Sequence, residues 1–156
     1  MQILLGSDHR GIDSALLLRD KLEREGHTVA LIAPEPGTAC DYPEPAYAVG
    51  TAVVRGDAEL GVLVCGTGIG MSIAANKVHG VRAALVHDEL TAQLSKSHNN
   101  ANIICLSADL LGQKSMEQIV DVVLRTPFEG GRHQRRLDKI TAIETGSTPA
   151  ETPSTS

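Results

Sequence analysis

The chain has 156 residues, of which 42% are apolar, and this is enough for one compact domain with its own core. Its net charge is −5 and only 2% of its residues are aromatic, so it lacks the basic surface and the stacking side chains typical of nucleic-acid binding. No apolar stretch is long enough to span a membrane, and the N-terminus lacks signal-peptide features. We therefore expect a cytoplasmic protein with neither nucleic acid nor membrane as a partner.

The three cysteines, Cys40, Cys65 and Cys105, are too few for a disulfide scaffold, and none lies in a CxxC pair. The sequence therefore predicts reduced thiols and no metal site. Cys105 lies inside an apolar run and is interpreted as a small buried side chain, whereas Cys40 lies in a loop without an evident partner.

Short apolar runs alternate with segments of helical spacing along most of the chain. In chain order, the sequence predicts a strand at 2–6, a helix that begins at 12 and ends before 26, a strand at 27–33, an irregular proline-rich loop at 34–45, a helix at 46–55, a strand at 60–65, a helix at 70–78, a strand at 81–86, a helix at 88–97, a strand at 102–107, a helix at 113–125 and a last helix at 132–143. Uninterrupted apolar strands that alternate with helices are typical of a parallel sheet buried on both faces. We therefore expect a five-stranded, doubly wound α/β domain.

We expect this domain to occupy residues 1–146, and the sequence contains no internal repeat. Residues 147–156 are polar, rich in proline and threonine, and lack large apolar side chains. This composition predicts a disordered tail.

Polar residues follow the ends of the first four predicted strands. In open α/β sheets, ligands bind beyond the carboxyl ends of the strands, so these residues are candidates for a binding site. They are Asp8, His9 and Arg10 after the first strand, Asp41 and Tyr42 after the second, Cys65 with its glycines after the third, and His87 and Asp88 after the fourth.

Three alternate glycines, Gly66, Gly68 and Gly70, follow the third strand. Such a loop lets backbone N–H groups converge on an anion at the start of a helix, but a tight turn that requires glycine for close packing explains it about equally well. The stretch lacks the lysine of a P-loop, and Met71 stands where the third glycine of a dinucleotide-binding loop would be. A nucleotide ligand is therefore disfavoured.

Cys65 lies at a strand end and faces the start of the next helix, a setting that favours the thiolate. A thiolate at this position is compatible with a nucleophile, a redox sensor or a base that removes a proton from carbon. A plain core cysteine is the alternative, and the polar neighbours at the same edge tilt the interpretation toward chemistry.

A second group of polar residues belongs to the opposite edge of the sheet. His98 closes the fourth helix, and Arg132 and Arg136 lie one turn apart on the last helix, an arrangement suited to a phosphate or to a solvated basic face. Because these helices run away from the carboxyl ends of the strands, His98 and Arg132 are not expected to reach Cys65 in their own subunit. A symmetric dimer would bring the two groups together twice.

With these residues identified, the chain resembles the type B ribose-5-phosphate isomerases, within the wider family that includes the galactose-6-phosphate isomerase subunits. The resemblance covers about residues 1–144. Its motifs, specific in combination, are GSDHRG, DYP, CGTGIGMSIAANK, QLSKSHNNAN and EGGRHQRRLDKI. The resemblance implies a Rossmann-like three-layer αβα sandwich, a C-terminal helix used in dimerisation, and homodimers, sometimes tetramers, with shared sites. It also implies an aldose–ketose isomerase of sugar phosphates that uses no metal and no organic cofactor.

The resemblance also implies roles for individual residues. Cys65 matches the base that moves a proton between C1 and C2, and His98 matches the residue that opens the furanose ring, with Thr67 and Asp8 nearby. The remaining matches are substrate contacts: backbone amides of Gly66, Gly68, Ile69 and Gly70 for the enediolate, His9, Arg132 and Arg136 for the phosphate, Asn99 for the sugar, and Tyr42 beside the sugar ring.

One departure concerns Asp109, which stands where many relatives have an arginine that contributes to phosphate binding. An acid beside a phosphate is unfavourable, so either Asp109 points away or the substrate is held differently. The expected reaction is the interconversion of D-ribose 5-phosphate and D-ribulose 5-phosphate. The alternatives are the same chemistry on allose 6-phosphate, galactose 6-phosphate or a tetrose phosphate, and, in another class, a non-catalytic anion-binding or thiol redox-sensor module.

Overall fold

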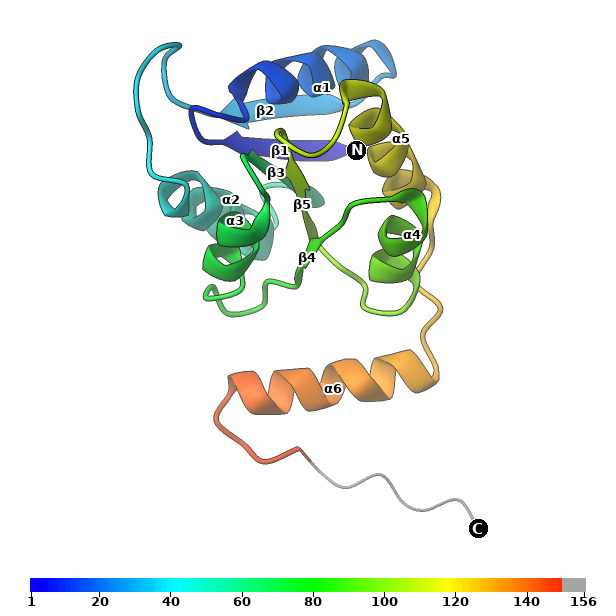
Figure 1. The fold of residues 1–156 in the computed structure, drawn as a ribbon. Coiled ribbons are helices and arrows are strands. Elements are labelled where there is room, and N and C mark those ends of the chain that lie inside the picture. Colours follow the sequence, from blue (N-terminus) through cyan, green and yellow to red (C-terminus); the bar gives the residue numbers. More distant parts are fainter. Residues whose placement is uncertain (150–156) are drawn as a thin grey trace.

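Strands and helices alternate along residues 1–149, the part of the chain that the computed structural model describes (Figure 1). The strands are β1 (Gln2–Ser7), β2 (Thr28–Ile32), β3 (Leu60–Cys65), β4 (Ala83–Leu85) and β5 (Ile103–Ser107). The helices are α1 (Ile12–Arg24), α2 (Pro43–Arg55), α3 (Ile69–Ala75), α4 (Glu89–Ser97), α5 (Gln113–Arg125) and α6 (Arg132–Glu144). The predicted order of elements is confirmed.

The strands form one parallel sheet in the order β2-β1-β3-β5-β4. Because the strands are parallel, their carboxyl ends share one edge of the sheet, the carboxyl edge, and their amino ends share the opposite amino edge. In the centre, Cys65 at the end of β3 pairs with Ser107 at the end of β5. The long buried strands β1, β3 and β5 therefore hold the loops of the carboxyl edge at fixed positions.

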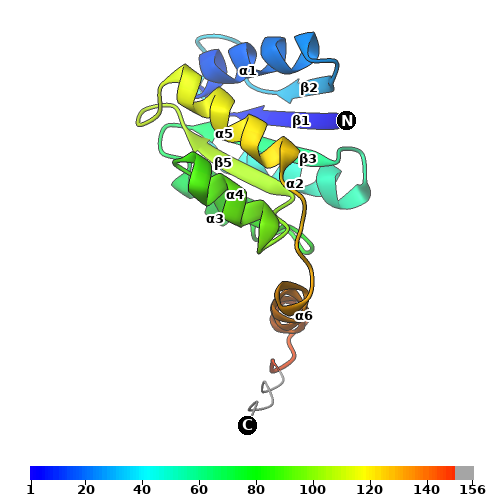
Figure 2. The same ribbon diagram turned by 90° about the vertical axis from the view of Figure 1, so that its right-hand side faces the viewer.

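Helices cover both faces of the sheet and make it the middle of three layers (Figure 2). On one face, α1, α4 and α5 bury side chains such as Leu18, Ala92 and Ile119 against the strands. On the other face, α2 and α3 bury Val49 and Met71. Fully burying an apolar side chain of this size contributes about 1.5–3 kcal/mol, so the two clusters hold the layers together. The predicted αβα sandwich is confirmed.

Helix α6 lies apart from these three layers in both views, and Figure 1 shows it beyond the β4 side of the molecule (Figures 1 and 2). It buries His133 and Leu137 but leaves Ile140 and Ile143 46% and 61% exposed. An apolar face left in water on an extended helix is typical of a surface that contacts another molecule.

Two helix boundaries differ from the sequence prediction by three residues, and the other boundaries differ by two residues at most. Helix α2 begins at Pro43, inside the segment 34–45 that was predicted to be irregular. Proline is favoured in the first helical turn, where no N–H donor is needed and its fixed φ suits the helix, so these prolines start α2. Helix α3 ends at Ala75 rather than 78, because the Asn76 side chain bonds both the N–H and the C=O of Ala83 and turns the chain toward β4.

The predicted tail at 147–156 follows α6, and residues 150–156 lie outside the described part of the chain. The last turn of α6 is closed by the Ser147 amide, which donates to the carbonyl oxygen of Ala142 (2.8 Å). Within residues 1–149, the helices are too short or too polar to cross a bilayer.

Candidate active site

Cys65 ends β3 at the carboxyl edge and is 4% exposed. The Gly68 amide donates to its sulfur, with 3.1 Å between N and Sγ. The Gly68 N–H therefore holds the sulfur of Cys65 against the start of the glycine turn. The carbonyl oxygen of Cys65 accepts from the Ala108 amide (2.9 Å), so the loop after β5 also fixes this strand end.

The other two thiols have different surroundings. Cys105 is fully buried in β5, and burial raises the pKa of its thiol well above the usual range, as expected for a small core side chain. Cys40 is half-buried in the loop before α2, where desolvation and then the carboxylate of Glu44 raise the pKa of its thiol. Both environments oppose a thiolate, so Cys65 is the thiol suited to chemistry.

Each of the three positions after Cys65 that carry glycine would disfavour a larger side chain for a steric reason. Gly68 has φ +76°, which glycine adopts readily. A Cβ on Gly70 would lie 2.6 Å from the ring of Tyr42, and a Cβ on Gly66 would lie 2.8 Å from Nε of Arg10. The turn therefore lets two neighbouring loops approach its backbone closely.

Within the same turn, the hydroxyl of Thr67 accepts from the Ile69 amide (3.3 Å). Thr67 is exposed, so its hydroxyl is accessible to a ligand at the carboxyl edge.

The loop after β1 lies directly beside the glycine turn. Asp8 is buried, and its Oδ1 accepts from the amides of Arg10 (2.9 Å) and Gly11 (3.0 Å). Gly11 sits so close to β3 that an added Cβ would lie 2.2 Å from the carbonyl oxygen of Val64. His9 reaches outward, and its Nδ1 lies 3.1 Å from the carbonyl oxygen of Cys40. Asp8 thus shapes the loop, and His9 joins it to the segment that carries Tyr42.

Asp109 faces Arg10 across the glycine turn instead of pointing away. Asp109 Oδ2 accepts from Nη2 of Arg10 at 2.7 Å, and the Asp109 amide donates to the carbonyl oxygen of Gly66 (3.0 Å). Arg10 was expected at this edge of the sheet and Asp109 was identified as a departure, but their pairing was not predicted. The opposite charges of the two residues are the only sequence signal for the pair, and they are 99 positions apart.

Asp88, a further carboxylate at this edge, caps the N-terminus of α4. Its Oδ1 accepts from the Thr91 amide (2.7 Å), and the Thr91 hydroxyl lies 3.3 Å from the Asp88 amide, which together form a capping box. Hydrogen bonds from the Thr91 amide and then its hydroxyl lower the pKa of Asp88. A structural role therefore accounts for Asp88.

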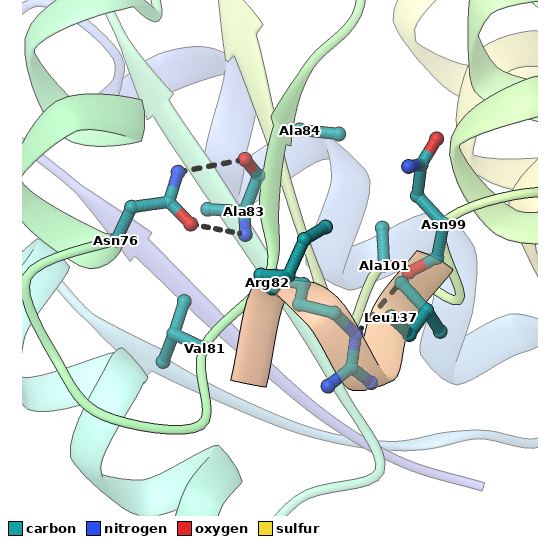
Figure 3. Close-up of a pocket in the computed structure, with 9 residues that line it drawn as sticks. Asn76, Val81, Arg82, Ala83, Ala84, Asn99, Ala101 and Leu137 are labelled. Atoms are coloured by element: carbon teal, nitrogen blue, oxygen red, sulfur yellow. Dashed lines mark hydrogen bonds between the residues drawn. The ribbon is translucent and has the colours of Figure 1, made fainter. Parts of the chain in front are cut away.

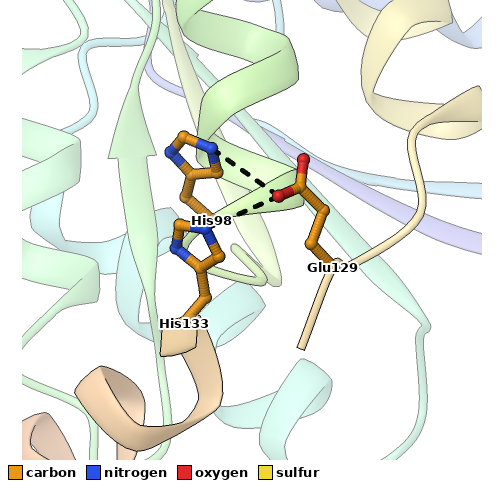
Figure 4. A group of neighbouring side chains, drawn as sticks. All are labelled: His98, Glu129 and His133. Atoms are coloured by element: carbon orange, nitrogen blue, oxygen red, sulfur yellow. Dashed lines mark ion pairs between the residues drawn. The ribbon is translucent and has the colours of Figure 1, made fainter. Parts of the chain in front are cut away.

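A second cluster lies at the amino edge, where α4, the segment before α6 and the start of α6 meet (Figure 4). The imidazoles of His98 and His133 stack, with ring centroids 4.1 Å apart and an interplanar angle of 11°. Glu129 Oε2 lies 3.9 Å from Nε2 of His98 and 3.5 Å from Nε2 of His133. Glu129 and His133, which the sequence analysis did not single out, are thus the immediate partners of His98.

These three side chains offer two nitrogens and one oxygen within 4.8 Å of one another, a donor set of the type that Zn²⁺ takes. Zinc–ligand distances are only about 2.0–2.2 Å, so both stacked rings would have to tilt toward a common ion. Arg132 also places its Nε 3.4 Å from Nε2 of His133, which adds positive charge. The cluster as arranged is therefore poorly suited to a metal ion.

The cluster can be tested through His133, because the pKa of this residue affects how the stability of the protein depends on pH. Burial lowers the pKa of His133, and the charges of His98, Arg132 and Arg136 lower it further, while Glu129 acts in the opposite direction. Below about pH 6.5 the unfolded chain therefore binds a proton more readily than the folded chain, so stability is lost as the pH falls from that value. We expect His133→Gln to reduce the fall in the urea midpoint between pH 7.5 and 5.0. The control is His79→Gln, which changes an exposed histidine and should leave the wild-type pH profile unchanged. A profile of His133→Gln that is parallel to that of the wild type would contradict this assignment.

A cavity of about 230 Å³ lies between the start of β4 and α6 (Figure 3). Asn99, Arg82, Leu137 and Ile140 line it, and Arg82 Nε donates to the carbonyl oxygen of Asn99 (3.2 Å). This cavity is at the amino edge and does not include Cys65. Asn99, which lines this cavity together with Leu137 and Ile140, therefore lies beside α6 and follows His98 in the chain.

The predicted site residues therefore form two groups within one chain. Cys65, Thr67, the glycine turn with Ile69, Asp8, His9 and Tyr42 are at the carboxyl edge, whereas His98, Asn99, Arg132 and Arg136 are at the amino edge. The five residues of β5 separate these edges by roughly 16 Å at 3.3 Å per residue. One chain alone does not assemble the complete set, as its topology predicts.

Comparison with proteins of related sequence places the chain in a family. Residues 3–140 match the model of the Ribose/Galactose Isomerase family. A probable ribose-5-phosphate isomerase B of Mycoplasma genitalium is 44% identical over 144 residues, which cover 91% of this chain and 95% of that protein. The D-erythrulose-4-phosphate isomerase of Pectobacterium atrosepticum is 39% identical over 141 residues, which cover 90% of this chain and 93% of that protein.

Solved structures agree with this assignment. Ribose-5-phosphate isomerase B of Clostridium thermocellum superposes with a TM-score of 0.92 at 40% identity, covering 94% of this chain and 99% of that one. The Mycoplasma genitalium enzyme with bound ribulose-5-phosphate gives a TM-score of 0.85 at 41% identity, covering 94% of this chain and 97% of that one. This chain therefore belongs to the ribose/galactose isomerase family, and it is an isomerase with the fold of the type B ribose-5-phosphate isomerases.

Proposed function

We propose that the protein interconverts D-ribose 5-phosphate and D-ribulose 5-phosphate. The observation that carries this proposal is the buried thiol of Cys65, which receives the Gly68 N–H at the carboxyl edge beside the Asp8 loop. The relative with bound ribulose-5-phosphate supports the choice of a pentose phosphate. Membership of the isomerase family supports the reaction class.

The proposed reaction begins with ring opening. His98, with Thr67 nearby, takes the proton from O1 while the C1–O4 bond breaks and O4 receives a proton, which gives the open-chain aldehyde. A neutral imidazole has one nitrogen that accepts a proton and one that donates, so it suits both parts of this transfer. Glu129 Oε2 lies 3.9 Å from Nε2 of His98, and the ring centroid of His133 lies 4.1 Å from that of His98. These two contacts position the His98 ring for the transfer.

Proton transfer between carbons follows. The Cys65 thiolate takes the proton from C2, the electrons of that bond form the C1–C2 double bond, and negative charge passes to O1. The thiol then returns the proton to C1 while the O2 proton moves to O1, which leaves the ketone at C2. Fixed N–H donors stabilise charge where it develops. We assign this task to the amides of Gly66 and Gly70, because the Gly68 amide donates to the sulfur of Cys65 and the Ile69 amide donates to the hydroxyl of Thr67.

The complete site requires a second copy of the chain in this proposal. His98, Asn99, Arg132 and Arg136 of one subunit would complete the Cys65 site of the other, so a two-fold homodimer contains two identical sites. The exposed apolar face of α6, with Ile140 and Ile143, supports a role of this helix in dimerisation. Pairing of such dimers would give a tetramer.

The substrate contacts follow from the same arrangement. The guanidiniums of Arg132 and Arg136, together with His9, would bind the phosphate, Asn99 would contact the sugar, and Tyr42 would lie along it. A phosphate held far from the reacting carbons positions them over Cys65, and base and oxyanion stabilisation supply the chemistry without a cofactor.

A second candidate substrate is a tetrose phosphate, because the D-erythrulose-4-phosphate isomerase is 39% identical to this chain. The same residues would perform the same proton transfer on a shorter sugar. A redox-sensor function fits less well, because sensor thiols are solvent-accessible and Cys65 is 4% exposed.

The test is a comparison of kcat/KM for D-ribose 5-phosphate, D-allose 6-phosphate, D-galactose 6-phosphate and D-erythrulose 4-phosphate, with aldose–ketose conversion followed by NMR. We expect the highest value for ribose 5-phosphate. Cys65→Ala prepared in parallel controls for contaminating isomerases. A higher value for another sugar would replace the proposed substrate, and no turnover of any of them would favour a non-catalytic module.

A further inference from the structure

The carboxyl edge of one chain is acidic and carries a single permanent cation in its loops. Arg10 is the only lysine or arginine in the connecting segments at this edge, which are residues 8–11, 33–42, 66–68, 86–88 and 108–112. The same segments carry five carboxylates, Asp8, Glu35, Asp41, Asp88 and Asp109. A sugar phosphate that approaches Cys65 therefore needs positive charge, and this chain supplies it at one residue.

The structure holds Arg10 at a defined place beside the reacting thiol. Its Nε is 2.8 Å from the position that a Cβ on Gly66 would occupy, so the guanidinium lies against the backbone of the residue after Cys65. Its Nη2 donates to Asp109 Oδ2 at 2.7 Å. Both ends of this ion pair are anchored, because the Arg10 amide bonds Asp8 and the Asp109 amide bonds the carbonyl oxygen of Gly66.

Arg10 remains available to a ligand despite this pairing. Its side chain is 57% exposed, and a guanidinium has five N–H donors, of which the bond to Asp109 uses one at Nη2. Exposed ion pairs contribute little to stability, so folding alone gives a weak reason for this arrangement. The planar fork of arginine matches the oxygens of a phosphate and places two parallel hydrogen bonds on it.

We propose that Arg10 binds the phosphate of the substrate from the carboxyl edge, and that Asp109 is the residue that positions Arg10. This inference rests on the proposed function for the identity of the substrate. Asp109 thereby becomes compatible with an anionic ligand, because its charge is paired with Arg10. The phosphate then meets one cation from the subunit that carries Cys65, in addition to the arginines assigned to the second subunit.

The first experiment measures Arg10→Ala and Arg10→Lys by steady-state kinetics with D-ribose 5-phosphate and by calorimetric titration with inorganic phosphate. A hydrogen bond between charged groups corresponds to about a 10- to 100-fold change in affinity, so Arg10→Ala should raise KM and the Kd for phosphate by that factor. Arg10→Lys should recover part of the affinity, because it keeps the charge but loses the fork. The matched control is Arg125→Ala, which breaks an exposed ion pair with Glu89 and should leave both values unchanged.

The role of Asp109 is tested by a double-mutant cycle of Arg10→Ala and Asp109→Ala. If Asp109 acts through Arg10, the loss of affinity on Arg10→Ala is smaller in the Asp109→Ala background than in the wild type. Additive effects would remove Asp109 from the proposal.

The outcomes separate the two proposals. A wild-type KM and phosphate Kd in Arg10→Ala would refute phosphate binding by Arg10, and the proposed reaction would stand. An absence of sugar-phosphate turnover in the wild type would refute the proposed reaction, and the phosphate titration would still decide the function of Arg10.

Discussion

Cys65→Ala is expected to remove isomerase activity while the protein stays folded. A positioned general base contributes about 10²- to 10⁴-fold to the rate, so kcat should fall by at least the lower of these factors. The fall belongs to kcat rather than KM, because the thiol acts on the C–H bond and not on the phosphate. The substitution removes one buried atom at a strand end, so the apolar cluster of β3, α2 and α3 retains its other side chains.

The measurement is steady-state turnover of D-ribose 5-phosphate together with a thermal melt of each variant. Cys105→Ala is the matched control, because Cys105 is also a buried cysteine and lies on the adjacent strand β5. It should retain turnover and lose only some stability through its cavity. Wild-type kcat in a folded Cys65→Ala protein would rule out Cys65 as the carbon base.

Mixing two inactive variants, Cys65→Ala and His98→Gln, is expected to restore activity. In each mixed dimer, one site receives both substitutions, and the other receives intact Cys65 from one subunit and intact His98 from its partner. Random assembly of equal amounts makes half of the dimers mixed, and half of the sites in these are intact, so about a quarter of the wild-type activity should return. Co-expression with two different affinity tags isolates the mixed dimer and should raise this fraction to about a half.

The control is a mixture of Cys65→Ala and Thr67→Ala. Both residues lie at the carboxyl edge of the same chain, so every site of this mixed dimer carries one defect and activity should stay at the level of the single variants. A shared site would be refuted if the His98→Gln mixture gave no more activity than this control, or if sedimentation found a fully active monomer.

The sequence was sufficient for the fold because the strands are strongly marked. β3 and β5 are continuous apolar runs buried along their whole length, and such runs between helices are compatible with few architectures other than a parallel sheet. The start of α2 was predicted incorrectly because prolines were interpreted as breakers. Pro43 instead occupies the first turn, where proline is favoured, and local composition does not distinguish these two positions.

The candidate site was predictable in part for a related reason. A parallel sheet brings the residues after its strands to one edge, so the order of strands and loops along the chain is enough to group Asp8, Tyr42 and Cys65. The same topology predicts that His98 lies at the other edge. The partners of these residues were not predictable, because the contact between Glu129 and His98 depends on the path of the segment that leads into α6.

By itself, the sequence determined the layer architecture, the position of the thiol after β3 and the separation of the site residues between two edges. These features follow from apolar periodicity and chain direction, which are local properties of the sequence. Only the tertiary structure decided that the Gly68 N–H meets the sulfur of Cys65 and that Asp109 pairs with Arg10. Contacts of this kind depend on the approach of loops to within a few ångströms, and the packing of β1, β3 and β5 sets that approach.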